Sequence, residues 1–556
     1  MMGWLALSAC NFIRPTALAV VTPATATVTA PVAAPASSTT ATAPPSLTAT
    51  QSVAAVIQPT ATPTSAAIPP LTASPTPTST SNPILTLPSG PIPTPTASAA
   101  TPYSDVFITA ATPTLSVTYL PTITRSYYPQ AQMLGMAIGG FNNESGLDYA
   151  LQLGTHWVRR WQPISWRDVE PNEGEYHWEA LAGLESELPQ ARAAGIEPIL
   201  SVQFTPEWAQ QVVPYACGPI RADKFGAFAA FMEQLVMRYG SSSPHNVRNW
   251  MIGNELDVAP GEIQPDSVFG CWGDPNDAYF GGGSYAEMLK VVTPRMKAVD
   301  PQAQVILGGL LMQCDPYSSP LGARPSCVSE SRWKSGFFLE GVMRAGGGDY
   351  FDMVDVHSYS VMSNLPSRMN SYYEWSGPLG GTGLPEKVTF VRQVMTNYGY
   401  GDKPVFTSEI ALKCEEPTAD CYDAAAAFIP RAYAEAYNLN LAGTTYFALI
   451  SDFKYKGLLL PDFTPRPAYW AYKFMSSQIV GAQYEGSVMS YPGVSGAQFL
   501  QVSGQHVQIV WSTDGNDQIV TLPGNFAQAL DKFGNPVPPN GNRVTVGWSP
   551  IYIVLN

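Results

Sequence analysis

The stretch NWMIGNELD, residues 249–257, decides how this chain folds. Most of it reads as a buried strand, yet it runs straight into an amide and a carboxylate, Asn254 and Glu255. Burying an unpaired carboxylate costs several kcal/mol, roughly, so the end of this strand must open onto a cavity or a partner. The stretch KPVFTSEI at 403–410 repeats the pattern and ends beside Glu409.

Short apolar runs alternate with segments of helical periodicity on both sides of these stretches. The eight candidate strands are 132–140, 155–161, 197–204, 247–255, 303–311, 353–359, 403–410 and 442–450. The candidate helices include 224–240, 284–299, 334–346, 386–399 and 466–479. Eight strands, each followed by a helix, predict an α/β fold of the (β/α)8 or TIM-barrel type. A doubly wound open sheet is the alternative, but no Gly-rich phosphate loop follows the first strand.

The barrel is predicted to span residues 129–479, and the pattern after Ile479 becomes all-β. The run 505–512 turns at TDGND into 518–523, and 543–555 ends the chain. Short strands with Asp-Gly and Gly-Asn turns predict a small β-sandwich at 480–556, packed against the barrel. A carbohydrate-binding role of its own stays open for this part.

The N-terminal quarter has the composition of an exported stalk. Residues 1–14 contain LSAC, which resembles the lipobox of bacterial lipoproteins and would place a lipid on Cys10; a chance match is the alternative. Residues 15–128 are rich in Pro, Thr, Ala and Ser, with no charged residue between Arg14 and Asp105. Such a chain cannot bury enough apolar surface to fold, so a disordered linker is expected. The layout predicts an extracellular or cell-surface protein.

The overall charge excludes several kinds of partner. The chain has 29 Lys and Arg against 43 Asp and Glu, a formal net charge of -14. This acidic balance argues against nucleic acid and against an anionic membrane surface. The five histidines lie far apart without metal-ligand spacing, so we expect no metal and no cofactor. The sequence has no apolar run of 18 residues, so no transmembrane helix is expected. We also expect a monomer.

Six cysteines remain once Cys10 is set aside. An even number in an exported chain predicts disulfides, and six cysteines allow 15 connectivities. We favour the sequence-local pairs Cys314–Cys327 and Cys414–Cys421, which leave Cys217–Cys271. All six fall in or beside the long loops expected at the carboxyl ends of the strands, where they could stiffen a pocket wall.

The two strand-end glutamates predict a reaction. In a (β/α)8 barrel the carboxyl ends of all strands meet at one face, so Glu255 on strand four and Glu409 on strand seven should lie across one pocket. Glycoside hydrolysis needs two such carboxyl groups, one protonated to assist the leaving oxygen and one ionised. Asn254 could donate from its amide to a sugar hydroxyl.

Together with neighbouring motifs, these residues resemble clan A of the glycoside hydrolases, the four-seven superfamily of retaining barrels. Families five, thirty-nine and forty-two belong to it. The other motifs are HWVRRWQPISWRDVEPNEGEYHWEAL at 156–181, FTPEWA at 204–209 and DVHSYS at 355–360. The resemblance covers roughly residues 130 to 480. It implies that Glu255 is the acid/base and Glu409 the nucleophile, with Asn254 bound to the sugar and Arg159 holding Glu409 ionised.

Further side chains complete the expected site. His357 and Tyr359 share one face of strand six, and Trp208 after strand three could pack against a sugar ring. Strand eight departs from the family, because Tyr446 or Phe447 stands where many members have Trp. The sequence therefore predicts a retaining glycoside hydrolase acting on a carbohydrate. The alternatives are a glycan-binding protein on a degenerate barrel and a scaffold displayed on a stalk.

Overall fold

The structure is a computed structural model, and it describes residues 133–316, 333–373 and 375–556. The predicted lipobox segment with Cys10 and the predicted linker at 15–128 lie outside the described residues. The predicted pair Cys314–Cys327 cannot be followed either, because Cys327 lies outside them as well.

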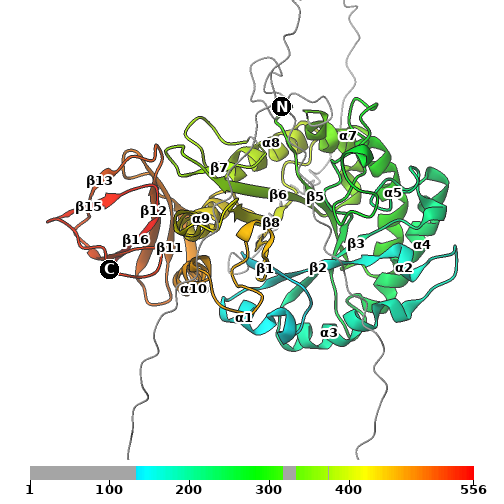
Figure 1. Ribbon diagram of the computed structural model, residues 1–556, viewed down its shortest axis with the longest axis horizontal. Coiled ribbons are helices and arrows are strands. Elements are labelled where there is room, and N and C mark those ends of the chain that lie inside the picture. The colour runs from blue at the N-terminus through cyan, green and yellow to red at the C-terminus, as the bar shows by residue number, and fades with distance from the viewer. Residues whose placement is uncertain (1–132, 317–332, 374) are drawn as a thin grey trace, which may run out of the picture. The chain divides into compact units, whose positions relative to one another are not determined.

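Eight parallel strands close into a barrel (Figure 1). They are β1 (Leu134–Ile138), β2 (Trp157–Ser165), β3 (Glu197–Gln203), β4 (Asn249–Ile252), β5 (Gln304–Leu310), β6 (Met353–Met362), β8 (Val405–Lys413) and β9 (Thr444–Tyr446). Each strand pairs with the next in this order, and β9 pairs with β1 to complete the ring. The predicted barrel is confirmed, and the open doubly wound sheet is excluded.

Helices cover the outside of the barrel in chain order. They are α1 (Leu147–Gln152), α2 (Trp166–Val169), α3 (Ala182–Ala193), α4 (Phe225–Tyr239), α5 (Gly282–Val299), α7 (Phe338–Arg344), α8 (Leu384–Asn397), α9 (Ala419–Asn438) and α10 (Pro467–Ile479). The five candidate helical segments correspond to α4, α5, α7, α8 and α10. Within the described ranges, no helix is both long enough and apolar enough to cross a membrane.

The 20-residue helix α9 was not among the candidate segments, and its burial explains why. Every residue from Ala424 to Tyr437 is buried. A helix buried on nearly all sides lacks the alternation of apolar and polar faces that marks a surface helix. Helix α9 contacts β8 on the barrel side and β11 of the C-terminal sheet on the other.

The amino-terminal end of the barrel is filled by apolar side chains. Seven of them form one buried cluster: Trp157, Ile199, Met251, Ile306, Met353, Phe406 and Ala442. They come from the first three residues of the strands or from just before them, so this end is closed. Polar groups can gather only at the opposite end, where the strands finish.

The C-terminal part forms two antiparallel sheets. Strands β10 (Gln483–Ser487), β11 (Val494–Leu500), β12 (His506–Ser512), β16 (Ile551–Leu555) and β14 (Phe526–Leu530) pair in that order, while β13 (Gln518–Thr521) pairs with β15 (Arg543–Val546). A core cluster that includes Val510, Val520 and Val546 joins the two sheets. The sequence is misleading in two details. The runs 505–512 and 518–523 lie in different sheets rather than in one hairpin, and 543–555 is divided between both.

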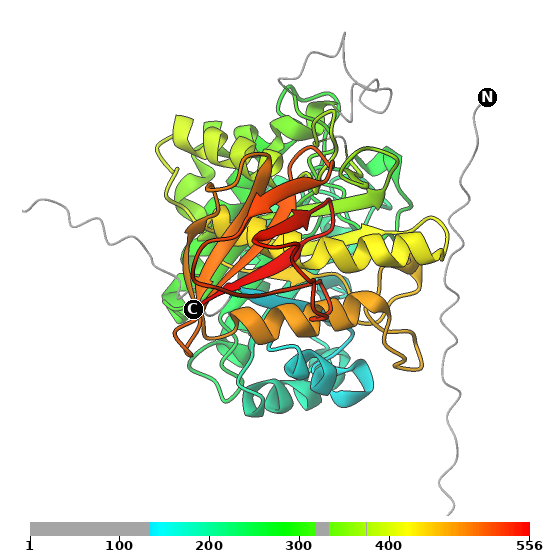
Figure 2. The same ribbon diagram turned by 90° about the vertical axis from the view of Figure 1, so that its left-hand side faces the viewer.

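The five-stranded sheet packs against the barrel helices, as expected. In Figure 2 the C-terminal sheets face the viewer, with α9 in yellow and α10 in orange behind them. The ring centroids of Tyr437 on α9 and Phe499 on β11 lie 4.9 Å apart, and those of Phe474 on α10 and Tyr552 on β16 lie 4.8 Å apart. These rings belong to or border the main core, which therefore runs continuously from the barrel into the sheet.

Candidate active site

The turn after β4 presents Asn254 and Glu255 at the carboxyl end of the barrel. The strand ends at Ile252, three residues earlier than its predicted end. The chain then turns through positive φ angles at Gly253 (80°) and Glu255 (46°). Such an angle at a residue other than Gly costs on the order of 1–3 kcal/mol and is found mainly at functional sites. Glu255 is nevertheless only 3% exposed, so the surrounding structure holds it in this conformation.

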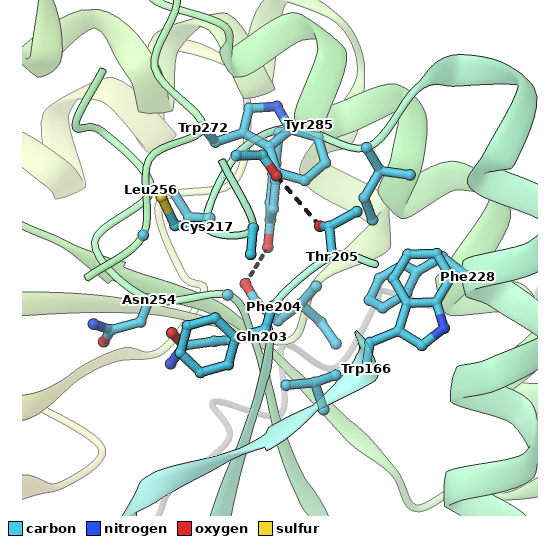
Figure 3. Close-up of a pocket in the computed structure, with 17 residues that line it drawn as sticks. Trp166, Gln203, Phe204, Thr205, Cys217, Phe228, Asn254, Leu256, Trp272 and Tyr285 are labelled. Carbon is cyan, nitrogen blue, oxygen red and sulfur yellow. Dashed lines mark hydrogen bonds between the residues drawn. The ribbon is translucent and has the colours of Figure 1, made fainter. Parts of the chain in front are cut away.

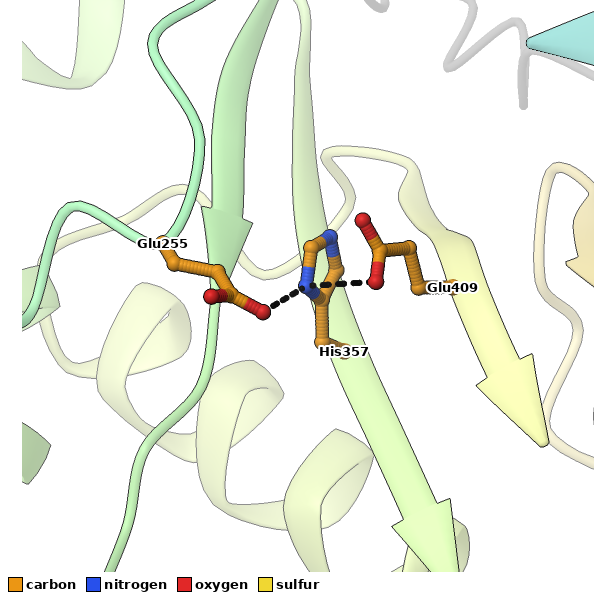
Figure 4. A group of neighbouring side chains, drawn as sticks. All are labelled: Glu255, His357 and Glu409. Atoms are coloured by element: carbon orange, nitrogen blue, oxygen red, sulfur yellow. Dashed lines mark hydrogen bonds and ion pairs between the residues drawn. The ribbon is translucent and has the colours of Figure 1, made fainter. Parts of the chain in front are cut away.

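Glu255 and Glu409 face each other, with His357 between them (Figure 4). Nδ1 of His357 lies 3.0 Å from Oε1 of Glu255 and 3.6 Å from Oε2 of Glu409. One ring nitrogen of His357 and one oxygen of each glutamate all lie within 4.8 Å of one another. Strands four, six and seven of the barrel thus bring two carboxyl groups and one imidazole into direct contact, as their positions at the strand ends predict.

Both carboxylate oxygens of Glu409 are engaged by other side chains. Nη1 of Arg159 donates to Oε1, and the hydroxyl of Tyr359 donates to Oε2. Burial by itself would raise the pKa of Glu409, but the charges of His357, Arg159 and Lys456 outweigh it and lower that pKa to about 2. Burial and the neighbouring glutamates raise the pKa of Tyr359, so its phenol stays protonated and keeps donating. Glu409 is therefore an ionised carboxylate in a site from which water is largely excluded.

A chain of hydrogen bonds sets the protonation of His357. Ser408 donates from both its hydroxyl and its backbone N–H to Asp355, so its oxygen is left to accept from Nε2 of His357 at 3.1 Å. Burial disfavours the imidazolium, but Glu409, Asp355 and Glu255 raise the pKa of His357 to about 9. At neutral pH the ring is charged, and Nδ1–H donates to Glu255.

Arg159 also orients Asn254. Its Nη2 donates to Oδ1 of Asn254 at 2.8 Å, so the amide N–H groups of Asn254 are directed away from the guanidinium. The neighbouring Arg160 pairs with Glu187 at 2.9 Å. The alternation of side chains along β2 thus separates the two arginines, as expected from its period of two.

Among the described residues, the contacts of Trp208 do not include Glu255 or Glu409. It stands in a short 3-10 helix, Glu207–Ala209, packs edge-on against Trp166 at 5.2 Å and donates from its indole to the carbonyl of Glu170. None of these contacts involves the other predicted site residues. Its role as a sugar platform stays a prediction.

A pocket lies beside Asn254, between the ends of β3 and β4 (Figure 3). Phe204, Cys217, Trp272 and Tyr285 are among the residues that line it. Cys217 is bonded to Cys271, so a disulfide stiffens one wall, as expected from the sequence. The second described disulfide, Cys414–Cys421, joins the end of β8 to the first turn of α9. Both pairings are confirmed.

Strand eight supplies Phe447 to the site and buries Tyr446. The hydroxyl of Tyr446 donates to the backbone carbonyl of Lys456 at 2.9 Å, and the side chain is fully buried. The ring of Phe447 lies 6.0 Å from the guanidinium carbon of Arg159 and 4.2 Å from Nζ of Lys456. Of the two candidates, Phe447 is therefore the one beside Arg159 and Lys456.

Three buried lysines near the glutamates were not predicted. Burial lowers the pKa of Lys387 and of Lys413 to about 7 and that of Lys456 to about 8. Nζ of Lys387 donates to the backbone carbonyl of His357 at 2.7 Å. Lys413 could have been found, because it follows Glu409 by four residues on one strand and so points to the same face. Lys456 lies on the loop after β9, where no periodic pattern marks it.

The Glu255, His357 and Glu409 cluster also has the donor atoms and spacing of a metal site. The positive charges around it argue for a different use. Arg159 and Tyr359 already occupy both oxygens of Glu409, and the charge of Lys456 acts on the same carboxylate. The cluster fits an ionised carboxylate held by protein cations better than it fits a divalent ion.

Comparisons with known proteins support the fold. No family model and no curated protein matches the sequence. Among solved structures, a family 39 glycoside hydrolase from the gut symbiont Bacteroides cellulosilyticus WH2 has a TM-score of 0.57 at 19% identity, covering 77% of this chain and 82% of that one.

Two further structures are more distant. A GH30 endoxylanase from Clostridium papyrosolvens C71 has a TM-score of 0.48 at 10% identity, covering 76% of this chain and 96% of that one. A conserved exported protein from Bacteroides fragilis has a TM-score of 0.49 at 11% identity, covering 72% and 87%. At such scores neither carries an argument. The first comparison shows that this chain shares the barrel fold of that enzyme.

Proposed function

We propose that this protein is a retaining glycoside hydrolase that cleaves a poly- or oligosaccharide by double displacement. The observation that carries the proposal is the pair of buried glutamates at the ends of strands four and seven. One oxygen of each carboxyl group lies within 4.8 Å of the other. Retaining enzymes hold their two carboxyl groups about 5–5.5 Å apart, whereas inverting enzymes leave about 6.5–9.5 Å for a water molecule. The spacing favours retention.

Glu409 acts as the nucleophile. Its low pKa keeps the carboxylate ionised over the whole physiological range, and Arg159 and Tyr359 fix its orientation. It attacks the anomeric carbon and forms a glycosyl-enzyme, and the positive charge of the arginine stabilises it again as leaving group in the second step. Asn254, oriented by Arg159, donates from its amide to a hydroxyl of the bound sugar.

Glu255 acts as the acid and then as the base. It must deliver a proton to the departing oxygen and later remove one from the attacking water. The charged imidazole of His357 donates to it at 3.0 Å from Nδ1, and Ser408, which is held by Asp355, accepts from Nε2 and fixes the orientation of the ring. The Glu255–His357 pair thus holds a transferable proton next to the bond that is cleaved.

The cysteines and the lipobox-like N-terminal segment support the proposed setting of the enzyme. Disulfides persist in oxidising compartments, so the two described pairs support an extracytoplasmic location. We place the protein outside the cell or at its surface, with a lipid on Cys10 as the anchor. The carbohydrate substrate would enter at the face formed by the carboxyl ends of the strands, with Trp208 as part of the approach.

Alanine variants of the two glutamates separate their roles. Glu409→Ala removes the covalent step, so even an aryl glycoside with an activated leaving group should not turn over. Glu255→Ala should still form the glycosyl-enzyme from that substrate, because a good phenolate hardly needs a proton. The intermediate should then accumulate, which gives a burst followed by slow turnover. Mass spectrometry should place the sugar on Glu409.

Glu416→Ala is the matched control, since Glu416 is exposed on the loop after β8 and its loss should leave turnover intact. Sugar attached to another residue, or an equal loss of the burst in both active-site variants, would overturn the assignment. Sugar binding without any hydrolysis would instead favour the glycan-binding alternative.

A further inference from the structure

Two lysines at the site have no hydrogen-bonded or ion-pair partner among the residues that the structure describes. Lys413 is 7% exposed and Lys456 is 5% exposed. Across the described ranges of the chain, no hydrogen bond or ion pair engages Nζ of either side chain. A buried ammonium group without a hydrogen-bonded partner is costly even with the charges of Glu255 and Glu409 nearby, and proteins rarely retain one without a use for it.

Aromatic rings surround both ammonium groups. Nζ of Lys413 lies 3.8 Å from the ring centroid of Tyr359 and 4.3 Å from that of Tyr372. Nζ of Lys456 lies 4.9 Å from the same Tyr359 ring and 4.2 Å from Phe447. The faces of aromatic rings attract cations, but they replace only part of the lost hydration. Burial lowers the pKa of Lys413, and the charge of Lys456 lowers it further because the two ammonium groups repel each other, while the charges of Glu255 and Glu409 act in the opposite direction.

The backbone holds the two lysines together. Lys413 is the last residue of β8, and Cys414 follows it with a disulfide to Cys421. The N–H of Cys414 donates to the carbonyl of Lys454 at 2.8 Å, which ties the end of β8 to the segment carrying Lys456. The hydroxyl of Tyr446 holds the carbonyl of Lys456 from the other side. The site is therefore built before any ligand arrives.

The negative charge of Glu409 does not explain why two buried lysines lie beside it. The oxygens of Glu409 already accept from Arg159 and Tyr359, and neither lysine donates to them. The shared Tyr359 ring places both ammonium groups next to the nucleophile, and Phe447 continues the same wall. An anionic group that reaches the two lysines would relieve their repulsion. Because both lysines lie next to Glu409, such a group would be a substituent of the sugar bound there.

We propose that Lys413 and Lys456 together bind an anionic substituent, a carboxylate or a sulfate, on the sugar that the two glutamates cleave. This rests on the proposed glycosidase activity and narrows its substrate to acidic glycans. A carboxylate would make that sugar a uronic acid, and a sulfate would make it a sulfated hexose. Both present oxygens that accept charge-assisted hydrogen bonds from ammonium groups.

The test compares matched aryl glycosides with the purified protein. For the glucose, galactose and mannose series in both anomeric forms, the neutral hexoside is compared with its uronide and its 6-sulfate. In at least one series kcat/KM for a charged member should exceed that for the neutral one by about 10- to 100-fold, the range of a buried hydrogen bond to a charged group. The preferred member identifies the anion.

Variants then locate the effect. Lys413→Met and Lys456→Met keep the apolar stems and remove the charges, so the ratio of charged to neutral kcat/KM should fall at least about tenfold. Lys454→Met is the matched control, because Lys454 lies two residues from Lys456 and pairs with Glu415 at the surface. It should keep the ratio. If a methionine variant fails to fold, Lys413→Arg and Lys456→Arg retain the charge and should retain the preference.

Calorimetric titration with free glucuronate, galacturonate, glucose 6-sulfate and glucose provides a readout that needs no hydrolysis. Binding of an acidic sugar that the methionine variants lose would support the site even if every glycoside resisted cleavage, an outcome that would count against the glycosidase alone. Hydrolysis of neutral glycosides without any preference for charged ones would overturn the acidic substrate and leave the glycosidase standing. Equal binding of all four sugars, or no binding of any of them, would also overturn the proposed acidic substrate.

Discussion

Replacing Arg159 by Met tests how the site keeps its nucleophile ionised. Arg159 is 2% exposed and donates to both Glu409 and Asn254, so Met fills much of the same volume without the charge. The pKa of Glu409 should rise, because a carboxylate that loses an adjacent cation is easier to protonate.

The size of the effect follows from the contributions to that pKa. The pKa of Glu409 falls from 4.5 to about 2 against the opposing effect of burial, a shift that corresponds to roughly 3 kcal/mol. His357, Arg159 and Lys456 contribute in that order. One opposite charge at contact lowers a carboxylate pKa by about 1–3 units, so the variant should titrate at about pH 3–5.

The measurement is kcat/KM against pH on an activated aryl glycoside. A nucleophile with a lowered pKa is active above that pKa and fails as the pH falls through it. The wild-type acid limb should therefore lie near pH 2, and that of Arg159→Met should move upward into the range about pH 3–5. Arg160→Met is the control, because Arg160 lies next in β2 but pairs with Glu187 away from the site. Its acid limb should not move.

The free energy of unfolding should also depend on the ionisation of Glu409. The ionised state of Glu409 contributes to folding above the ordinary pKa of a glutamate, and this contribution disappears as the pH falls through about 2. Arg159→Met should lose part of it at neutral pH and little at the acid end. If the variant does not fold, Tyr359→Phe removes one donor to Glu409 and should shift the limb in the same direction. An unmoved acid limb in both variants would refute the reasoning.

Three further outcomes are expected. EDTA should leave kcat/KM unchanged, because both oxygens of Glu409 are held by protein donors; activity lost and then restored by a divalent ion would contradict this. Phe499→Ala should lower the free energy of unfolding by about 3–5 kcal/mol in a single calorimetric transition, because its ring joins the C-terminal sheet to the barrel core, and two separate transitions would speak against that continuity. Replacing Cys414 and Cys421 by Ser should cost about 2–3 kcal/mol in urea unfolding, the value expected for so short a loop, and an unchanged midpoint would contradict it.

The sequence alone determined the barrel and the position of its two glutamates. Strands and helices alternate along the chain, and apolar runs that end in Glu255 and Glu409 can be recognised locally, since a strand buried on both faces allows a carboxylate only at its end. The alternation of side chains likewise separates Arg159 from Arg160. Two disulfides followed from short separations and elimination.

Only the tertiary structure decided that buried lysines join the predicted Arg159, His357 and Tyr359 around those glutamates, and how the C-terminal strands pair. Lys456 lies on an irregular loop, and its approach to Lys413 depends on a backbone hydrogen bond between segments distant in sequence. The pairing of β12 with β16 rather than β13, and the burial of α9 from both sides, depend on contacts across the whole C-terminal half. Periodicity reports which face of an element is buried, whereas the partner that buries it is fixed by non-local packing.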